Sequence, residues 1–200
     1  MDKKVGNLES GEKHLFDEIH KLRDSLNVYT KQAYNRFNPM NENLIDWKEK
    51  GRAVSGHDNN TIYESSTIIG DVKMGNNCWI GPFTILDGGG GLIIGDFVTV
   101  AASAMIFTHD TYKYTLSGGT VPYEYKSVVI GSNCFIGTQA TILKGVNIGH
   151  HSMISANSLI TCDIPPYSIA AGSPAKIIGR VVVSDDDIEL VYDKINERCD

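Results

Sequence analysis

The chain has 200 residues, a formal net charge of −6 and a hydrophobic content of 42%, which is ordinary for one soluble domain with an appendage. The acidic balance, without any basic stretch, argues against a protein that follows a nucleic-acid backbone. Residues 1–7 lack the apolar core of a signal peptide, and no apolar run approaches the ~20 residues that span a bilayer, so we expect a cytoplasmic protein.

An N-terminal helical segment is predicted over residues 1–56. Residues 11–37 place apolar side chains at the spacing of one helix face, namely at Leu15, Ile19, Leu22 and Leu26, and the pattern stops before Pro39. A second short helix is expected over residues 41–50, ended by Gly51. The segment would cap the open strand edge of the repeat that follows it.

The next part of the chain has a period of six residues. An aliphatic or Met residue recurs at Ile62, Ile68, Met74, Ile80 and Leu86, then at Ile94, Val100 and Ile106, and finally at Ile130, Ile136, Ile142, Ile148, Ile154 and Ile160. A smaller residue, such as Cys78 or Cys134, usually follows four positions later. This period fits neither a helix nor an alternating flat strand, but it fits a coil that turns a corner every six residues. We therefore predict an all-β solenoid, a parallel β-helix over residues 57–180.

Two segments interrupt this period. Residues 88–91 are four glycines at a two-residue slip, which we interpret as a bulged corner because the Lys-Ser/Thr of a P-loop is absent. Residues 107–129 form a longer excursion that contains Thr108, His109 and Asp110 and four tyrosines. Long loops on a regular scaffold commonly carry function, so we look for the site there.

The chain leaves the coil at Pro165 and Pro166. A tail over residues 181–200 follows, and residues 185–198 are predicted to form a short C-terminal helix that begins at Ser184 or Asp185.

Three stretches of the repeat resemble the hexapeptide-repeat (left-handed β-helix) acyltransferases: residues 130–137, 142–149 and 163–176. The last stretch is similar to the exit from the β-helix in sugar O-acetyltransferases of the galactoside, maltose and polysaccharide-modifying type. The resemblance covers about residues 62–180. It implies a left-handed coil, acetyl-CoA as the acyl donor, and a homotrimer with active sites between subunits.

Acetyl transfer to a hydroxyl needs a base, and histidine suits this role because its side chain titrates near neutral pH. His109 alone among the six histidines stands where the repeat ends and the excursion begins. Its Thr-His-Asp context resembles the catalytic histidine segment of these O-acetyltransferases, so we predict that His109 is the general base. Asp110 is a candidate to orient the imidazole, and a backbone carbonyl or Glu124 are the alternatives.

The acceptor is expected to contact two further residues. Asp87 should lie about one coil below Phe107 and close to His109, although a solvated corner carboxylate is the alternative. Tyr112, from the excursion, is the second candidate. Residues 34–36 of the N-terminal segment could also help to shape an acceptor pocket.

For the donor, the resemblance points to the last coils, at Thr138, Ala156, Thr161, Lys176 and Arg180. Small corner residues would let the pantetheine arm lie along the backbone. Lys176 and Arg180 could meet the phosphates of acetyl-CoA, or they could remain solvated. Phe135 departs from the Trp found in many relatives, so no contact through an indole N–H is expected at this position.

The predicted function is therefore transfer of an acetyl group from acetyl-CoA to a sugar hydroxyl, in surface-polysaccharide or sugar-nucleotide metabolism. N-acetylation of an amino-sugar nucleotide and a non-catalytic β-helical scaffold are the alternatives. A similar β-helix occurs in zinc-dependent carbonic anhydrases, which need three histidine ligands. His150 and His151 are consecutive and are expected to diverge, so no metal is predicted.

Overall fold

The computed structural model describes residues 9–193. It divides the chain into two compact units, Met1–Asp46 and Trp47–Asp200, which we call the N-terminal unit and the β-helix unit. The division falls nearer the N-terminus than the predicted boundary at residue 56. The reason is that α4 (Trp47–Ser55) packs on the first strands of the coil, where Val54 contacts the core.

The N-terminal unit contains α2 (Ser10–Tyr34) and α3 (Met40–Leu44). Helix α2 begins with a capping box between Glu9 and Glu12, which satisfies backbone N–H groups at its first turn. It ends at Asn35, whose backbone is left-handed. The helix predicted over residues 41–50 is instead two helices, α3 and α4.

Gly51 lies inside α4 and does not end it, contrary to the prediction. A Cβ atom at this position would lie 2.1 Å from the backbone oxygen of Asn60. The glycine is therefore required by the close approach of α4 to the start of the coil, and not by helix termination.

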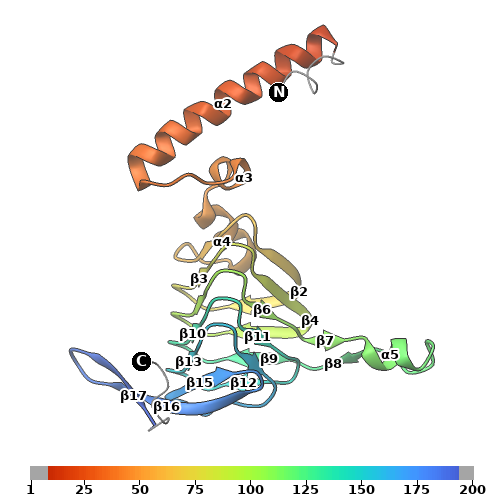
Figure 1. Cartoon of the computed structure of the whole chain (residues 1–200), viewed down its shortest axis with the longest axis vertical. Coiled ribbons are helices and arrows are strands. Elements are labelled where there is room, and N and C mark those ends of the chain that lie inside the picture. The colour runs from red at the N-terminus through yellow and green to blue at the C-terminus, as the bar shows by residue number, and fades with distance from the viewer. Residues whose placement is uncertain (1–8, 194–200) are drawn as a thin grey trace, which may run out of the picture. The chain divides into compact units, whose positions relative to one another are not determined.

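The β-helix unit is a stack of triangular coils, drawn from yellow to blue in Figure 1. The first face holds β1 (Thr61–Ile62), β3 (Trp79–Ile80), β5 (Thr99–Val100), β10 (Phe135–Ile136), β13 (Met153–Ile154) and β15 (Ser168–Gly172). The second face holds β6 (Met105–Ile106), β11 (Thr141–Ile142), β14 (Leu159–Ile160) and the first halves of β2 (Thr67–Met74) and β4 (Ile85–Ile94). The third face holds the second halves of β2 and β4, with β9 (Val128–Ile130) and β12 (Asn147–Ile148). All these strands pair in parallel, so equivalent hexad positions stack in register.

The predicted hexad residues form the core. All but one of the fourteen are buried, and the exception, Ile68, is half-buried. At the corners the chain turns through non-glycine residues with φ between 54° and 59°: Asn77, Phe83, Phe97, Ser103, Asn133, Gln139, His151, Asn157 and Tyr167. Most hexads bury the large residue and also the smaller residue four positions later, as at Cys78 and Cys134, and the β-helix prediction is confirmed.

The glycine run lies within a strand that bends around a corner. Gly70 of β2 pairs with Gly88 of β4, but Val72 pairs with Leu92, so β4 accommodates two extra residues between the second and third faces. The excursion leaves the next coil at the same corner. It consists of β7 (His109–Asp110), α5 (Tyr112–Leu116) and β8 (Glu124–Tyr125), and it projects from the stack in Figure 1.

The C-terminal helix prediction is wrong within the described residues. The chain forms β16 (Ala175–Val183) and β17 (Ile188–Tyr192), an antiparallel hairpin that extends the first face. Ser184 closes the turn between these strands, because its N–H donates to Asp187 O and its hydroxyl accepts from Asp187 N–H. Residues 188–192 pair with β16 in antiparallel register, from Ile188 opposite Val183 to Tyr192 opposite Gly179, so tertiary strand pairing decides the structure of this segment. Residues 194–198 of the predicted helix lie outside the described residues.

Candidate active site

The candidate site lies at the corner where the excursion leaves the coil. Leu86 of β4 pairs with Ile106 of β6, so the residues that follow them, Asp87 and Phe107, occupy equivalent places in neighbouring coils. Two residues later, His109 begins β7. The in-register stack therefore places His109 beside Asp87, as the sequence predicted.

Asp87 binds His109 directly. Its Oδ2 lies 2.6 Å from His109 Nδ1, and its side chain is 1% exposed. Burial favours the neutral carboxyl, but hydrogen bonds from Thr108 N–H, Gly89 N–H and His109 outweigh burial and lower the pKa of Asp87. Asp87 is therefore an anion beneath the imidazole.

This contact decides the tautomer of His109. An ionised carboxylate only accepts hydrogen bonds, so Nδ1 carries the proton and donates it to Asp87. Nε2 is then the unprotonated nitrogen, and the side chain is 33% exposed, so a hydroxyl can reach it. The arrangement has the geometry of a general base with an orienting carboxylate.

Glycine is needed where the two coils meet. Gly90 N–H donates to Thr108 Oγ1 over 2.7 Å, and Thr108 Oγ1 lies 3.2 Å from Asp87 Oδ2. A Cβ atom at Gly90 would lie 2.5 Å from the backbone oxygen of Thr108. The glycine run of residues 88–91 therefore allows the two backbones to approach closely, and this close approach holds Asp87 beneath His109.

The structure assigns Asp110 a different partner from the one predicted. Asp110 Oδ2 lies 2.7 Å from Lys144 Nζ, while His109 binds Asp87. Neighbouring residues of a strand point to opposite sides, so His109 and Asp110 diverge. Asp110 is thus not in position to orient the imidazole, and neither is Glu124, which also pairs with Lys144, at 3.3 Å.

Glu124 is the centre of an ion-pair cluster at the base of the excursion. Lys113, Lys126 and Lys144 lie 3.0, 3.2 and 3.3 Å from its carboxylate. Their hydrogen bonds, that of Lys113 first, lower the pKa of Glu124 to about 2. Lys144, whose side chain is 16% exposed, was missed in the sequence. Aligning consecutive coils would have found it, because Ile142 pairs with Ile106 and brings Lys144 beneath the excursion.

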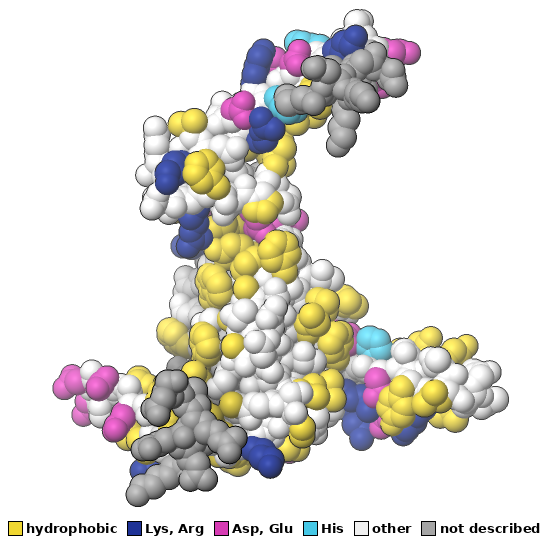
Figure 2. Space-filling model, in the orientation of Figure 1, with side chains coloured by type: hydrophobic (Ala, Val, Ile, Leu, Met, Phe, Trp, Pro, Cys, Tyr) yellow, Lys and Arg dark blue, Asp and Glu magenta, His cyan; other side chains and the backbone are white. Residues whose placement is uncertain are grey.

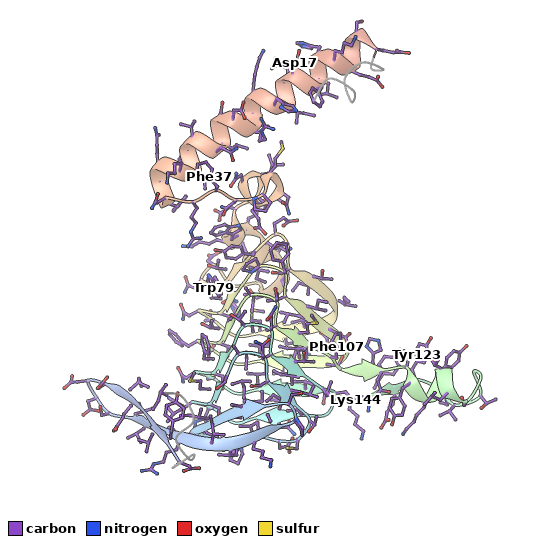
Figure 3. All side chains as sticks on the ribbon, in the orientation of Figure 1. Asp17, Phe37, Trp79, Phe107, Tyr123 and Lys144 are labelled. Atoms are coloured by element: carbon purple, nitrogen blue, oxygen red, sulfur yellow. The ribbon has the colours of Figure 1, made fainter. Side chains whose placement is uncertain are left out.

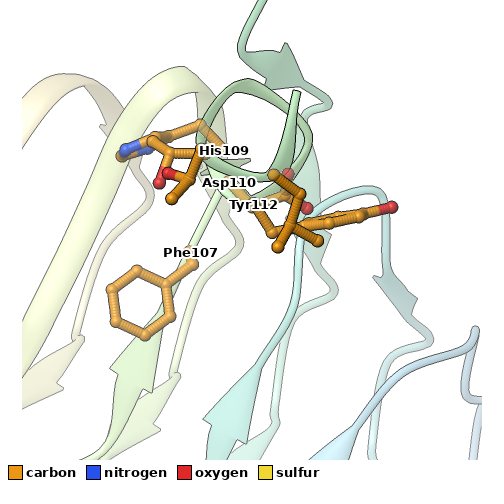
Figure 4. Close-up of a pocket in the computed structure, with 7 residues that line it drawn as sticks. Phe107, His109, Asp110 and Tyr112 are labelled. Atoms are coloured by element: carbon orange, nitrogen blue, oxygen red, sulfur yellow. The ribbon is translucent and has the colours of Figure 1, made fainter. Parts of the chain in front are cut away.

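An open pocket of about 530 Å³ lies beside the base. It is lined by Phe107, His109, Asp110, Thr111, Tyr112, Thr115 and Leu116. In Figure 4 the His109 imidazole and the Tyr112 ring extend to opposite sides of this pocket. The ring that packs on His109 belongs to Tyr125, with centroids 5.5 Å apart and planes 24° from parallel.

The predicted donor residues fall in separate places. Thr138 and Ala156 are exposed at neighbouring corners, where Asn157 N–H donates to Thr138 O. Thr161 is exposed at the end of β14, on another corner. Lys176 and Arg180 are exposed on β16, opposite Ala171 and Ser168 of β15.

His150 and His151 do not diverge as expected. Their Nδ1 atoms are 3.0 Å apart, because the left-handed backbone of His151 turns its side chain back, and Tyr167 stacks on its ring. Across residues 9–193, no group of three or more His, Cys, Asp or Glu side chains could hold a metal ion. In the same range, no helix combines the length and the apolar character needed to cross a membrane.

Comparisons with known proteins agree with this architecture. Residues 127–162 match the family model for bacterial transferase hexapeptide (six repeats). A Saccharomyces cerevisiae protein provisionally named an acetyltransferase is 34% identical over 176 residues, which cover 84% of this chain and 86% of the relative. Galactoside O-acetyltransferase of Escherichia coli is 26% identical over 171 residues, covering 72% of this chain and 84% of the enzyme. The chain spans about a third of the length of the Arabidopsis thaliana serine acetyltransferases that it also matches.

Among solved structures, a hexapeptide-repeat acetyltransferase of Vibrio cholerae in complex with acetyl coenzyme A aligns with a TM-score of 0.59. The alignment covers 86% of this chain and 90% of that one at 22% identity, which shows a shared fold. The yeast relative adds sequence identity over most of both chains. With its buried hexad core, the chain belongs to the hexapeptide-repeat (left-handed β-helix) acyltransferases.

Proposed function

We propose that this protein transfers an acetyl group from acetyl-CoA to a hydroxyl of a sugar or sugar-containing acceptor. The observation that carries the proposal is the pair formed by His109 and Asp87 at the edge of an open pocket. A buried carboxylate that fixes one imidazole nitrogen leaves the other free to accept a proton from the acceptor.

The reaction follows from this geometry. His109 Nε2 takes the hydroxyl proton while the acceptor oxygen attacks the thioester carbonyl carbon. Asp87 stabilises the imidazolium that forms. The tetrahedral intermediate then collapses, the carbon–sulfur bond breaks, and the imidazolium returns its proton to the departing sulfur. The products are CoA and an acetyl ester, and backbone N–H groups near the corner would stabilise the oxyanion.

Acetyl-CoA is the proposed donor because the related Vibrio cholerae acetyltransferase binds it on the same fold. Thr138, Ala156 and Thr161 are the proposed contacts for its pantetheine arm, since they are small or short and exposed at corners. Lys176 and Arg180 would meet its phosphates as exposed cations on one strand.

A sugar is the proposed acceptor because galactoside O-acetyltransferase aligns over most of both chains. Tyr112 lines the pocket and offers a ring and a hydroxyl to a sugar. Both oxygens of Asp87 are engaged by the protein, so we assign Asp87 to His109 and not to the acceptor. Surface-polysaccharide or sugar-nucleotide metabolism in the cytoplasm would supply such an acceptor.

We also propose a homotrimer. Exposed aromatic side chains follow the first face and its corners, at Trp79, Phe83, Phe97 and Phe135. Surface of this kind is typical of protein–protein contacts. The excursion leaves the corner between the second and third faces, opposite this first face.

An acceptor screen tests the proposed function. Sugars and sugar nucleotides, each as a hydroxyl and an amino form, are incubated with acetyl-CoA, released CoA is titrated with a thiol reagent, and products are identified by mass spectrometry. We expect an acetyl ester with wild-type protein and almost none with His109→Asn. Acetylation of amino forms alone would favour N-acetylation, and no CoA release with any acceptor would favour a scaffold.

A further inference from the structure

Helix α2 exposes a continuous apolar stripe that the proposed function does not use. The stripe consists of Leu15, Ile19, Leu22, Leu26, Tyr29 and Ala33. Leu15, Leu22 and Tyr29 are 60%, 45% and 59% exposed. Figure 2 shows hydrophobic side chains open to solvent along this helix, and Figure 3 shows its side chains radiating from the ribbon. Exposing these large apolar side chains to water is unfavourable in free energy, so we expect another surface to cover this face of α2.

The spacing of the stripe identifies the kind of partner. Its members are separated alternately by four and three residues, which is the seam of a coiled coil and not the wider face of a helix on a globular core. In the heptad repeat, Ile19, Leu26 and Ala33 occupy the a positions. Leu15, Leu22 and Tyr29 occupy the d positions.

The neighbouring helix in the N-terminal unit packs beside the seam and does not cover it. Asn43 of α3 contacts Thr30 Oγ1 over 3.2 Å and Asn27 over 3.4 Å. Thr30 and Asn27 lie on the flank of α2, next to Leu26, which is half-buried. The rest of the stripe, from Leu15 to Leu22, stays exposed.

The flanking charges favour the same helix from another copy. Glu18 occupies heptad position g, and Arg23, five residues later, occupies position e. In a parallel, in-register coiled coil, a residue at g contacts the residue at the following e position of the neighbouring helix. Within residues 9–193, Glu18 pairs with exposed Lys21 at 2.8 Å and Arg23 pairs with exposed Asp24 at 2.7 Å. Self-pairing thus brings opposite charges together on both sides of the seam.

We propose that α2 assembles with the α2 helices of other copies of this chain as a parallel, in-register coiled coil. A helix of 25 residues supplies about three heptads, which is short for an isolated pair. Tethering of several copies by their β-helix units would raise the effective concentration of α2 and offset that weakness. The pairing does not depend on catalysis.

Disulfide trapping in the full-length chain tests the proposal. In a Cys162→Ser, Cys199→Ser background, Leu22→Cys puts a thiol at d, and the control Asp24→Cys puts one at f, on the opposite side of the helix. Under mild oxidation we expect most of the Leu22→Cys protein, and little of the Asp24→Cys protein, to run as a linked dimer on a non-reducing gel. Equal linkage of both variants, or none, overturns the proposal.

Three further measurements determine the orientation of the helices and the identity of the partner. Mixed Leu15→Cys and Tyr29→Cys proteins should give links between like positions, and a link between unlike positions would indicate an antiparallel pair and overturn the proposal. Glu18→Arg should slow trapping at position 22, and adding Arg23→Glu should restore it. Binding of α2 to anionic lipid vesicles without trapping would identify a membrane surface as the partner and also overturn it. Since the substituted residues of α2 belong to the N-terminal unit and His109 belongs to the β-helix unit, CoA release by the same variants separates this result from the proposed chemistry.

Discussion

His109 and Asp87 lie 22 positions apart in sequence, yet Nδ1 of one is 2.6 Å from Oδ2 of the other. One turn of the coil plus the two residues that β4 accommodates at the glycine run brings Phe107 level with Asp87, and His109 follows two positions later. The pair therefore depends on the stacking register, and its chemistry can be tested by changing either member.

Replacing Asp87 with Asn should lower kcat by roughly 10²-fold or more, because a neutral amide neither selects the Nδ1–H tautomer nor stabilises the imidazolium. Steady-state kinetics with the acceptor found in the screen measure this effect. Asp71→Asn, at the same corner one coil earlier and exposed, is the matched control and should keep wild-type kcat. Equal losses in both variants would rule out a special role for Asp87.

Replacing His109 with Asn should lower kcat by ~10²–10⁴-fold, the usual contribution of a general base. The melting temperature should change little, because this partly exposed side chain adds little to a core of stacked isoleucines. Acetyl-CoA should still raise the melting temperature of the variant. His57→Asn is the control, and full activity of His109→Asn on a hydroxyl acceptor would refute the base assignment.

Lys144 should act as a positioning residue. Lys144→Met removes the ion pairs to Asp110 and Glu124 that hold the excursion against the coil, so His109 loses its fixed position. A catalytic group displaced by about 1 Å can lower kcat by about 10²-fold. We expect the KM for acetyl-CoA to change less. Lys126→Met is the control, because Lys126 pairs with Glu124 but is more exposed and does not reach Asp110.

The ion-pair cluster at Glu124 should resist acid. The pKa of Glu124 in the folded protein is about 2, below its ordinary value of 4.5. The ionised carboxylate therefore contributes its full stabilisation above pH 4.5, and this contribution disappears as the pH falls through about 2. Lys113 and Lys126 are exposed, so salt should weaken their ion pairs with Glu124. Peptic cleavage of the excursion, followed between pH 2 and 5, should be faster in Glu124→Gln than in wild type at the upper end, and the two should converge near the lower end.

Acetyl-CoA should raise the melting temperature of the wild-type protein. At ~100 times its dissociation constant, a ligand that binds only the folded state stabilises by about 2.7 kcal/mol. Lys176→Ala with Arg180→Ala should require more acetyl-CoA for the same shift, whereas Lys73→Ala, an exposed cation on another face, should not. No shift with any CoA species at millimolar concentration would refute the donor assignment.

The C-terminal hairpin illustrates where sequence patterns mislead. Residues 185–198 carry spacing compatible with a helix, and Ser184 is a good helix start, but pairing of Ile188–Tyr192 with β16 decides the structure. Tertiary strand pairing overrides a local preference worth only tenths of a kcal/mol per residue. Gly51 misled for a related reason, since its role is contact with Asn60 and not helix termination.

By itself, the sequence determined the β-helix, the positions of its core residues, the corner where the period breaks and the histidine that stands there. These features can be predicted from the local six-residue period, because each coil repeats the same pattern of buried residues. Only the tertiary structure decided which carboxylate serves His109, that Asp110 pairs with Lys144, and that Tyr125 covers the imidazole. Such contacts join different coils, so they depend on stacking register and on the path of the excursion, which no local pattern specifies.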